Sequence, residues 1–178
     1  GEKTLVMGIL NTTPDSFSDG GKYDDLELAY LRATLMIEQG ADIIDVGGES
    51  TRPGADSVSE TEEIRRTKDL IAKIRYNFPN QLISIDTTKS RVAKEAIDVG
   101  ANIINDVSAL QNDPNMGKIA ARFETGVVLM HKQGSPKSMQ INPNYKNVTR
   151  DVSDYLSQRL SAATNFGIKK NACVIDPG

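Results

Sequence analysis

The stretch Leu82–Asp106 reads LISIDTTKSRVAKEAIDVGANIIND and contains two short, mostly apolar runs separated by a helix-like segment. The first run stops at Asp86 and the second stops at Asn105, while the residues between them predict a helix within Ser90–Val99. A short apolar strand, a helix and a second apolar strand form the unit from which helix-covered parallel sheets are built. The stretch therefore predicts an α/β fold.

The same alternation extends in both directions from this stretch. Further apolar runs and helical spacings recur along the chain, separated by Gly-containing or polar segments. The predicted strands are Thr4–Leu10, Ala41–Val46, Leu82–Ile85, Asn102–Ile104, Val127–Met130 and Ala172–Ile175. The predicted helices lie within Leu26–Glu38, Glu60–Tyr76, Ser90–Val99, Asn115–Phe123 and Val148–Phe166. An open doubly wound sheet and a closed barrel both fit this periodicity.

Polar or Gly-rich residues follow nearly every predicted strand. They are Asn11, Gly47-Gly48-Glu49, Asp86, Asn105-Asp106, His131 and Asp176. In parallel α/β folds the ligand site lies at the carboxyl ends of the strands. A barrel brings all of these ends to one mouth, whereas an open sheet uses one switch point. The pattern therefore favours a (βα)₈ TIM barrel.

The chain is short for a complete barrel of this kind. It has 178 residues, whereas an eight-stranded barrel needs about 250. The predicted elements supply about six βα units. We therefore expect residues 1–178 to form a single barrel domain that is incomplete at its C-terminus.

Composition limits the classes of function. The 21 Lys and Arg residues nearly balance 24 Asp and Glu residues, for a net charge of −3. This balance gives no support to a nucleic-acid or membrane partner. A single cysteine, Cys173, excludes an internal disulfide framework and is typical of a reducing compartment. We therefore expect a cytoplasmic location.

Three motifs are far more specific than the periodicity. They are Gly8-Ile9-Leu10-Asn11-Thr12-Thr13-Pro14-Asp15-Ser16-Phe17-Ser18-Asp19-Gly20-Gly21, Gly47-Gly48-Glu49-Ser50-Thr51-Arg52-Pro53-Gly54 and Ile83-Ser84-Ile85-Asp86-Thr87. With Asn105-Asp106 and Asp176-Pro177-Gly178, they closely resemble the dihydropteroate synthases in order and spacing. That family folds as a (βα)₈ barrel. The resemblance implies a transferase of folate biosynthesis, the target of sulfonamides, which condenses (7,8-dihydropterin-6-yl)methyl diphosphate with p-aminobenzoate to 7,8-dihydropteroate and pyrophosphate.

The resemblance also implies roles for individual residues. It implies Mg²⁺ as cofactor with Asn11 as its protein ligand, and a homodimer for the complete enzyme. The implied catalytic residues are Asp15, Asp86 and Asp176. The implied pterin-binding residues are Thr51, Asp86, Asn105 and Asp176. The implied p-aminobenzoate-binding residues are Phe17, Ser50, Thr51, Arg52 and Pro53.

The residue types fit these roles on physical grounds. A pterin ring presents an amino group and ring N–H donors, which buried carboxylates accept, and a carboxamide can both donate and accept. Mg²⁺ prefers oxygen ligands and often uses few protein groups beside substrate phosphates. The chain offers no obvious nucleophile–base pair, which favours a dissociative reaction in which pyrophosphate leaves first. Glu49 and Asp106 are expected to support the site without a direct role.

Two other functions stay open. A pterin-binding methyltransferase of the same superfamily would share Asp86, Asn105 and Asp176 but has no use for Ser50-Thr51-Arg52-Pro53. A catalytically inactive fragment or binding module is the second alternative. The family carries a Ser-x-Lys motif after its seventh strand and an Arg-x-His motif after its eighth, and both positions lie beyond the six strands predicted for residues 1–178.

Overall fold

The computed structural model describes residues 3–12, 22–49, 57–134 and 144–178. Strands and helices alternate through this part of the chain. The elements are β1 (Met7–Asn11), α1 (Lys22–Glu38), β2 (Ile43–Gly47), α2 (Glu60–Asn77), β3 (Leu82–Asp86), α3 (Ser90–Asp98), β4 (Ile103–Asp106), α4 (Met116–Phe123), β5 (Gly126–Met130), α5 (Val148–Asn165), the short 3₁₀ helix η2 (Lys170–Ala172) and β6 (Cys173–Asp176).

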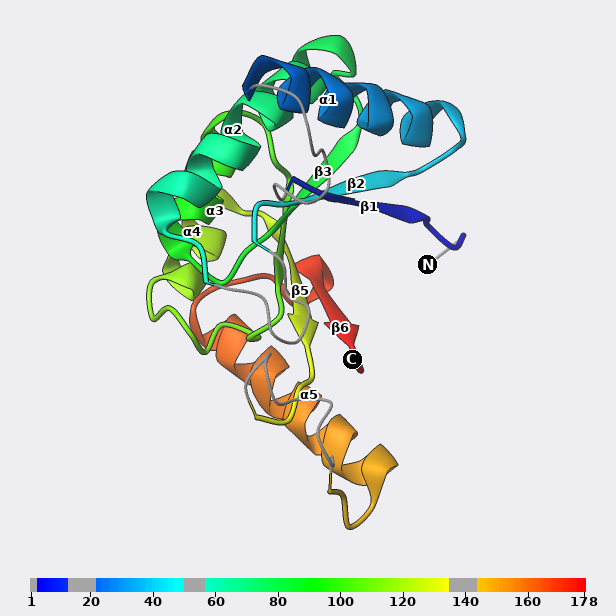
Figure 1. The fold of residues 1–178 in the computed structure, drawn as a ribbon. Helices are drawn as coiled ribbons and strands as arrows, with labels where there is room; N and C mark the ends of the chain where they lie inside the picture. Colours follow the sequence, from blue (N-terminus) through cyan, green and yellow to red (C-terminus); the bar gives the residue numbers. More distant parts are fainter. Residues whose placement is uncertain (1–2, 13–21, 50–56, 135–143) are drawn as a thin grey trace.

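The six strands form one parallel sheet in the order β1-β2-β3-β4-β5-β6. This order follows the sequence without a reversal, as in a barrel, whereas a doubly wound sheet reverses at its switch point. Helices α1 to α4 lie together on one side of the sheet (Figure 1). The prediction of an α/β fold with barrel topology is confirmed, and the sheet of the described residues is an open arc.

One row of side chains joins the sheet to its helices. Leu10, Val46, Ile85, Ile104 and Val127 are successive partners across β1 to β5. All of them are at most 1% exposed, and they belong to the core that the helices cover. Full burial of such a side chain stabilises the fold by about 1.5–3 kcal/mol. Because side chains alternate along a strand, their immediate neighbours must point to the opposite, uncovered face.

The first strand begins at Met7 and not at Thr4 as predicted. Upstream of Met7, the Asp42 side chain replaces a backbone partner in the sheet. Its Oδ2 accepts from the Val6 amide at 2.9 Å. The Val6 carbonyl accepts from the amides of Asp42 and Ile43 at 2.9 and 3.1 Å. The length of an apolar run therefore overestimates the length of the strand where a neighbouring carboxylate accepts a hydrogen bond from the backbone.

At the other end, four strands include the polar residue at which the sequence predicted a stop. Asn11, Asp86, Asp106 and Asp176 are the last residues of β1, β3, β4 and β6. Their backbones are therefore set by the strand pairing, which is more precise than placement on a connecting loop. This matters because three of these residues are predicted site residues.

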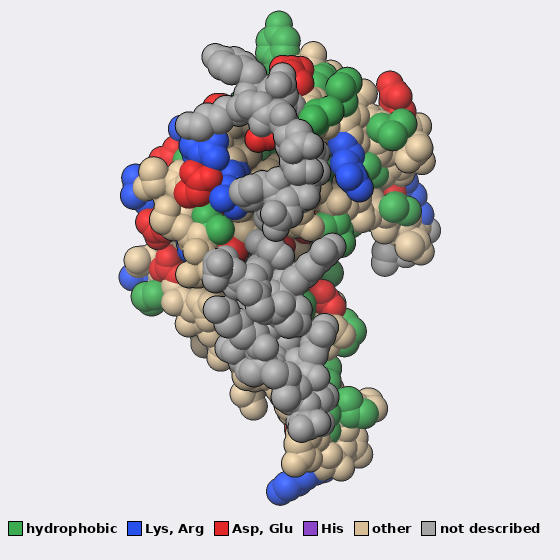
Figure 2. All heavy atoms as spheres, viewed as in Figure 1, with side chains coloured by type: hydrophobic (Ala, Val, Ile, Leu, Met, Phe, Trp, Pro, Cys, Tyr) green, Lys and Arg blue, Asp and Glu red, His purple; other side chains and the backbone are tan. Residues whose placement is uncertain are grey.

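Acidic and basic side chains lie next to one another on the visible surface, with no large patch of one sign among the coloured residues (Figure 2). On α2, for example, Arg65 and Arg66 both pair with Glu62, at 2.6 and 2.8 Å. Among the helices that the structure describes, none combines the length and apolar character required to cross a bilayer.

The helix-facing row provides a test of the fold. Replacing Ile104, which has no exposed surface, by Ala should lower the free energy of unfolding by about 2–5 kcal/mol, because it removes buried methyl groups and leaves a cavity. Tyr76→Ala, at a side chain that is 86% exposed, should change it by less than about 0.5 kcal/mol. Urea titration of the whole protein measures both, and equal effects would contradict the assignment of the covered face.

Candidate functional site

The uncovered face of the sheet carries a second row of side chains, and this row is polar. Asn11 pairs with Gly47, Gly47 with Asp86, and Asp86 with Asn105. Consecutive partners in a sheet point to the same face, so the three polar side chains project from neighbouring strands around Gly47. Asp176 pairs with Met130, two residues beyond the Val128 that pairs with Asn105. It therefore lies on the same face, one step nearer the mouth.

Gly47 leaves a gap in this row. A β-carbon built there would lie 3.0 Å from Asn11 Oδ1 and 3.6 Å from Asp86 Oδ2. A side chain at this position would therefore fill the space between the amide and the carboxylate. Its absence allows a ligand or a water to approach the backbone between β1 and β3.

A buried carboxylate, Asp45, lies one layer below this row. Asp45 is 3% exposed, and its Oδ2 accepts from Asn105 Nδ2 at 3.0 Å. This bond orients the Asn105 amide, because the nitrogen is committed to Asp45 and the oxygen Oδ1 remains as an acceptor. Motif reasoning missed Asp45 as a functional residue, although a carboxylate between Ile44 and Val46 in an apolar strand is a signal, since Asp is almost never fully buried without a partner.

Three buried oxygen atoms in this cluster, two from carboxylates and one from a hydroxyl, lack a hydrogen-bond partner of good geometry. They are Asp45 Oδ1, Asp86 Oδ1 and Ser84 Oγ, none of which has a hydrogen-bond partner among the described residues. An unsatisfied buried polar group typically costs 1–3 kcal/mol, so such groups are rare in native proteins. The Ser84 hydroxyl can donate to Asp45, and its hydrogen bond lowers the pKa of that carboxyl. Asp86 Oδ1 is therefore the acceptor that most needs a donor from a ligand.

Burial raises the pKa of two carboxyls in this cluster, and neighbouring charges raise one of them further. Burial, followed by the charges of Asp45, Glu63, Asp106 and Glu49, raises the pKa of Asp86 to about 8. Burial also raises the pKa of Asp45. Strongly raised carboxyl pKa values in a cavity are typical of functional sites. A ligand that supplies N–H donors would reverse the shift, because it favours the ionised form.

Asp106 supports the site from the covered side of the sheet. Its carboxylate accepts from the Ser108 amide at 2.7 Å, the Ser108 hydroxyl at 2.6 Å and the Leu110 amide at 2.9 Å. These bonds hold Ala109 and Leu110 in left-handed conformations, with φ of 50° and 65°, which cost of order 1–3 kcal/mol each. Asp106 thus fixes the loop that follows Asn105 and has no place in the polar row itself.

Asp176 and His131 meet at the last strand. The His131 amide donates to the Asp176 carbonyl at 2.8 Å, and Asp176 Oδ1 accepts from the Gly178 amide at 2.9 Å. The His131 ring is buried and packs edge-on against Tyr155 with ring centroids 5.0 Å apart. The histidine therefore acts as a packing residue beside the site.

The remaining predicted site residues belong to two segments that the structure does not describe. Asp15 and Phe17 fall within 13–21, and Ser50, Thr51, Arg52 and Pro53 fall within 50–56, so all of them lie outside the described residues. The described residues contain no group of three or more His, Cys, Asp or Glu side chains that could hold a metal. Asn11 offers a single neutral oxygen donor, which suits an ion whose other ligands are water and phosphate.

Comparisons with known proteins agree with this geometry. Residues 7–178 match the family described as pterin binding enzyme. The chain is 46% identical over 178 residues to the dihydropteroate synthase of Clostridium beijerinckii, covering all of this chain and 63% of that protein. It is 49% identical over 175 residues to that of Escherichia coli, covering 97% of this chain and 61% of that protein.

Solved structures give the same result. A Clostridium difficile dihydropteroate synthase crystallised in the presence of pteroic acid superposes with a TM-score of 0.91 at 42% identity, covering all of this chain and 65% of that one. The Yersinia pestis enzyme in complex with a sulfonamide drug also gives 0.91 at 42% identity, over 99% of this chain and 64% of that one. The chain thus spans about three fifths of the length of the curated relatives that it matches.

The raised pKa of Asp86 predicts a pH-dependent cost to stability. The pKa of Asp86 is near 4 in the unfolded chain and about 8 in the folded protein. At pH values between these two, the native state holds a proton that the unfolded state has lost. The group therefore destabilises the fold increasingly as pH rises. Asp86→Asn removes this cost and should stabilise the protein more at pH 9 than at pH 5. We expect a difference of about 4 kcal/mol, because the cost grows over roughly three pH units at about 1.4 kcal/mol each.

Urea titrations at both pH values measure this difference. Asp69→Asn, at an exposed position on α2, is the matched control and should show none. A pH-independent effect of Asp86→Asn would mean that Asp86 is ionised at neutral pH and that another group accounts for the buried charge.

Proposed function

The chain belongs to the pterin-binding enzyme family, and from this premise we propose that it supplies the pterin site of a dihydropteroate synthase. The proposed reaction joins (7,8-dihydropterin-6-yl)methyl diphosphate to p-aminobenzoate and releases pyrophosphate. The observation that carries the proposal is the buried Asp86 carboxylate, whose Oδ1 has no hydrogen-bond partner among the described residues, with Asp45 and Ser84 buried beside it. The dihydropteroate synthase names of the relatives support it.

The proposed pterin contacts follow from the polarity of these atoms. A pterin has an amino group and adjacent ring N–H donors on one edge, which require acceptors in a dry pocket. Asp86 Oδ1 is a buried acceptor without a partner, and Asn105 Oδ1 is left free by the bond from Nδ2 to Asp45. Asp176 lies on the same face nearer the mouth. Thr51 completes the proposed pterin contacts.

In the proposed reaction, the bond between the pterin methylene carbon and the diphosphate oxygen breaks, and its electron pair leaves with the diphosphate. The carboxylates of Asp86 and Asp176, with Asp15, stabilise the positive charge that spreads over the pterin. The amine of p-aminobenzoate then forms the new C–N bond and loses a proton. A dissociative path of this kind needs no covalent enzyme intermediate.

Asn11 would hold Mg²⁺ in this proposal. Its Oδ1 faces the gap above Gly47, where a hard, neutral oxygen donor fits a metal that takes its remaining ligands from water and phosphate. Bound there, Mg²⁺ would neutralise negative charge on the leaving diphosphate. The Asp45, Asp86 and Asp176 side chains of this cluster carry no positive charge, so the diphosphate charge must be balanced by the metal and by cationic groups outside the cluster.

The other parts of the proposal rest on the family resemblance. Phe17, Ser50, Thr51, Arg52 and Pro53 are the proposed p-aminobenzoate contacts. A homodimeric complete enzyme and a cytoplasmic location belong to the same proposal. The single sheet and single core of the described residues support the assignment of residues 1–178 to one barrel domain.

A turnover assay tests the function. The whole protein, supplied with the pterin diphosphate, p-aminobenzoate and Mg²⁺, should release pyrophosphate and form 7,8-dihydropteroate. A sulfonamide should compete with p-aminobenzoate. Pterin binding without formation of dihydropteroate under these conditions would show that the proposed reaction is wrong.

Asp86→Ala tests the pterin contacts directly. The substitution leaves ring donors unpaired in a dry site, which costs about 1–3 kcal/mol. We therefore expect the dissociation constant of pteroic acid to rise about 10- to 100-fold by calorimetry. Asp69→Ala, remote from the site on α2, should leave it unchanged. An unchanged constant in the Asp86 variant would remove this carboxylate from the pterin site.

The proton balance of binding provides a separate test. Asp86 has a pKa of about 8 in the free site, so most molecules carry a proton on it at pH 7. Accepting pterin N–H groups requires the ionised form, and binding at pH 7 should therefore release a proton. Calorimetry in buffers of different ionisation enthalpy measures this release. A binding enthalpy independent of the buffer would contradict it.

A further inference from the structure

Asp45 of β2 and Ser84 of β3 lie one layer below the polar row of the sheet. The two residues are register partners, and their row continues through Ile9 of β1 and Ile103 of β4. Asp45 is 3% exposed and Ser84 is fully buried. Partners in one row share a face, so the Asp45 carboxylate lies in a row whose outer members are apolar. An aliphatic side chain would suit this position better than a charged one.

Stability does not explain a carboxylate at this position. Burial raises the pKa of Asp45, and hydrogen bonds with Ser84 and Asn105 offset the rise only in part. None of the ion pairs between described residues includes Asp45. A buried charge without a cationic partner destabilises the folded state. The presence of Asp45 therefore requires a reason other than stability.

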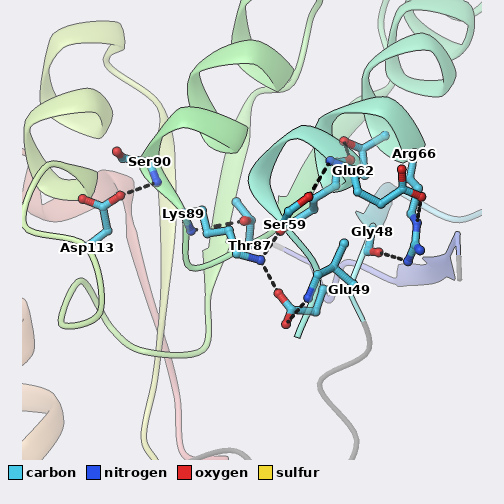
Figure 3. A network of polar contacts seen from close by, with 12 residues as sticks. Gly48, Glu49, Ser59, Glu62, Arg66, Thr87, Lys89, Ser90 and Asp113 are labelled. Atoms are coloured by element: carbon cyan, nitrogen blue, oxygen red, sulfur yellow. Dashed lines mark hydrogen bonds and ion pairs between the residues drawn. The ribbon is translucent and has the colours of Figure 1, made fainter. Parts of the chain in front are cut away.

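Asp113 shows how a carboxylate stabilises the fold elsewhere in this protein. Its Oδ2 accepts from the Ser90 amide at 2.8 Å, at the start of α3 (Figure 3), and its Oδ1 accepts from the Asn115 amide at 2.9 Å. Burial alone would raise its pKa, but the hydrogen bonds from Asn115 and Ser90 lower the pKa of Asp113 overall. The folded state therefore favours the charge of Asp113 and disfavours that of Asp45.

The Asp45 carboxylate instead holds the Asn105 side chain, which comes from two strands away. Asp45 Oδ2 accepts from Asn105 Nδ2 at 3.0 Å, although β3 lies between β2 and β4. Adjacent strands lie about 4.7–4.9 Å apart, so the Asn105 side chain must lean across β3, between Asp86 and Ser84. Among the described residues, Asp45 is the one hydrogen-bond partner of the Asn105 side chain. Asp45 therefore determines where this amide lies.

We propose that Asp45 is a positioning residue for the pterin, which holds the Asn105 amide beside Asp86 and so raises the affinity of the site. This inference rests on the proposed function, because Asn105 and Asp86 are proposed pterin contacts. Without Asp45, the Asn105 side chain would be free to rotate, and binding would have to fix it. Fixing a mobile side chain opposes binding, whereas a side chain that is already held binds without this loss.

Asp45→Ala is the main variant, because it removes the acceptor and keeps every proposed pterin contact. In the whole protein, we expect the dissociation constant of pteroic acid to rise about 10-fold by calorimetry. Asp45→Asn keeps an oxygen that can accept from Asn105 Nδ2, so its constant should stay within about 3-fold of the parent. An unchanged constant in Asp45→Ala would overturn the proposal. Equal losses in both variants would also overturn it, because they would assign the effect to the charge.

Asp45→Leu separates the loss of the acceptor from a folding defect. It removes the same acceptor and fills the space in a row that already contains Ile9 and Ile103. Replacement of a buried charge by an apolar side chain is often neutral or stabilising. This variant should therefore require at least as much urea to unfold as the parent, and it should show the same rise in the dissociation constant of pteroic acid. Parent-like affinity in this variant would contradict the positioning role.

Asp113→Ala is the matched control for the loss of a carboxylate. It removes the acceptor for the Ser90 and Asn115 amides, so it should unfold in less urea than the parent. Because Asp113 lies outside the polar row, the variant should bind pteroic acid as tightly as the parent does. A parallel loss of affinity in this control would mean that affinity simply follows stability, and the proposal would fail.

A double-variant cycle shows whether Asp45 acts through Asn105. Asn105→Ala alone removes the proposed contact. Adding Asp45→Ala to it should raise the dissociation constant by less than about 2-fold further, because the two residues act in series. A fully multiplied effect would mean that Asp45 acts on another group, such as the charge of Asp86, and would count against the proposal.

The Asn105 side chain also provides a measurement that needs no ligand. Hydrogen exchange of its amide can be followed by NMR and assigned by the loss of the signal in Asn105→Ala. Asp45→Ala should speed this exchange about 10-fold, and Asp113→Ala should leave it unchanged. If the parent does not bind pteroic acid, the proposed function is wrong, and this exchange alone decides the positioning role. Unchanged exchange in Asp45→Ala overturns that role.

Discussion

The parallel register of β1 to β4 is the constraint on which the rest of the structure depends. Because side chains alternate along each strand, the register that places Leu10, Val46 and Ile85 in one covered row also places Asn11, Gly47 and Asp86 in one open row. A shift of a single residue would exchange the two faces. Burial of the apolar row against the helices therefore fixes the polar row with the same precision.

This arrangement separates the groups that stabilise the fold from those that strain it. The helix-facing row is apolar and fully buried, whereas the layer beneath the mouth contains Asp45, Ser84 and Asp86 with buried, unpartnered oxygens. The left-handed residues Ala109 and Leu110 add backbone strain beside Asn105. Such costs persist only where the surrounding structure determines the conformation, and here the sheet and its helices do so. Functional sites commonly carry this kind of stored cost.

The sequence predicted most of the fold, because short apolar runs that stop at polar residues are a local signal. Periodicity alone did not determine the strand order, which depends on pairing between distant segments. The start of β1 was misplaced because the Asp42 side chain competes for the Val6 backbone. Asp86 and Asn105 were found through their positions at strand ends. Asp45 was missed as a feature of the site, since its role arises from Asn105, a partner 60 residues away.

The hydrogen bond between Asn105 and Asp45 affects which tautomer of a heterocyclic ligand binds best. An asparagine free to rotate its amide can match a heterocycle that presents either a protonated or an unprotonated ring nitrogen. Here the nitrogen of the amide is already engaged, so rotation would bring two acceptors face to face. The orientation of the amide is thereby fixed before any ligand arrives, with Oδ1 as an acceptor and the second N–H of Nδ2 left as a donor. A heterocycle that can shift a ring proton would then bind best in the tautomer whose N–H and acceptor positions match this fixed order of oxygen and nitrogen.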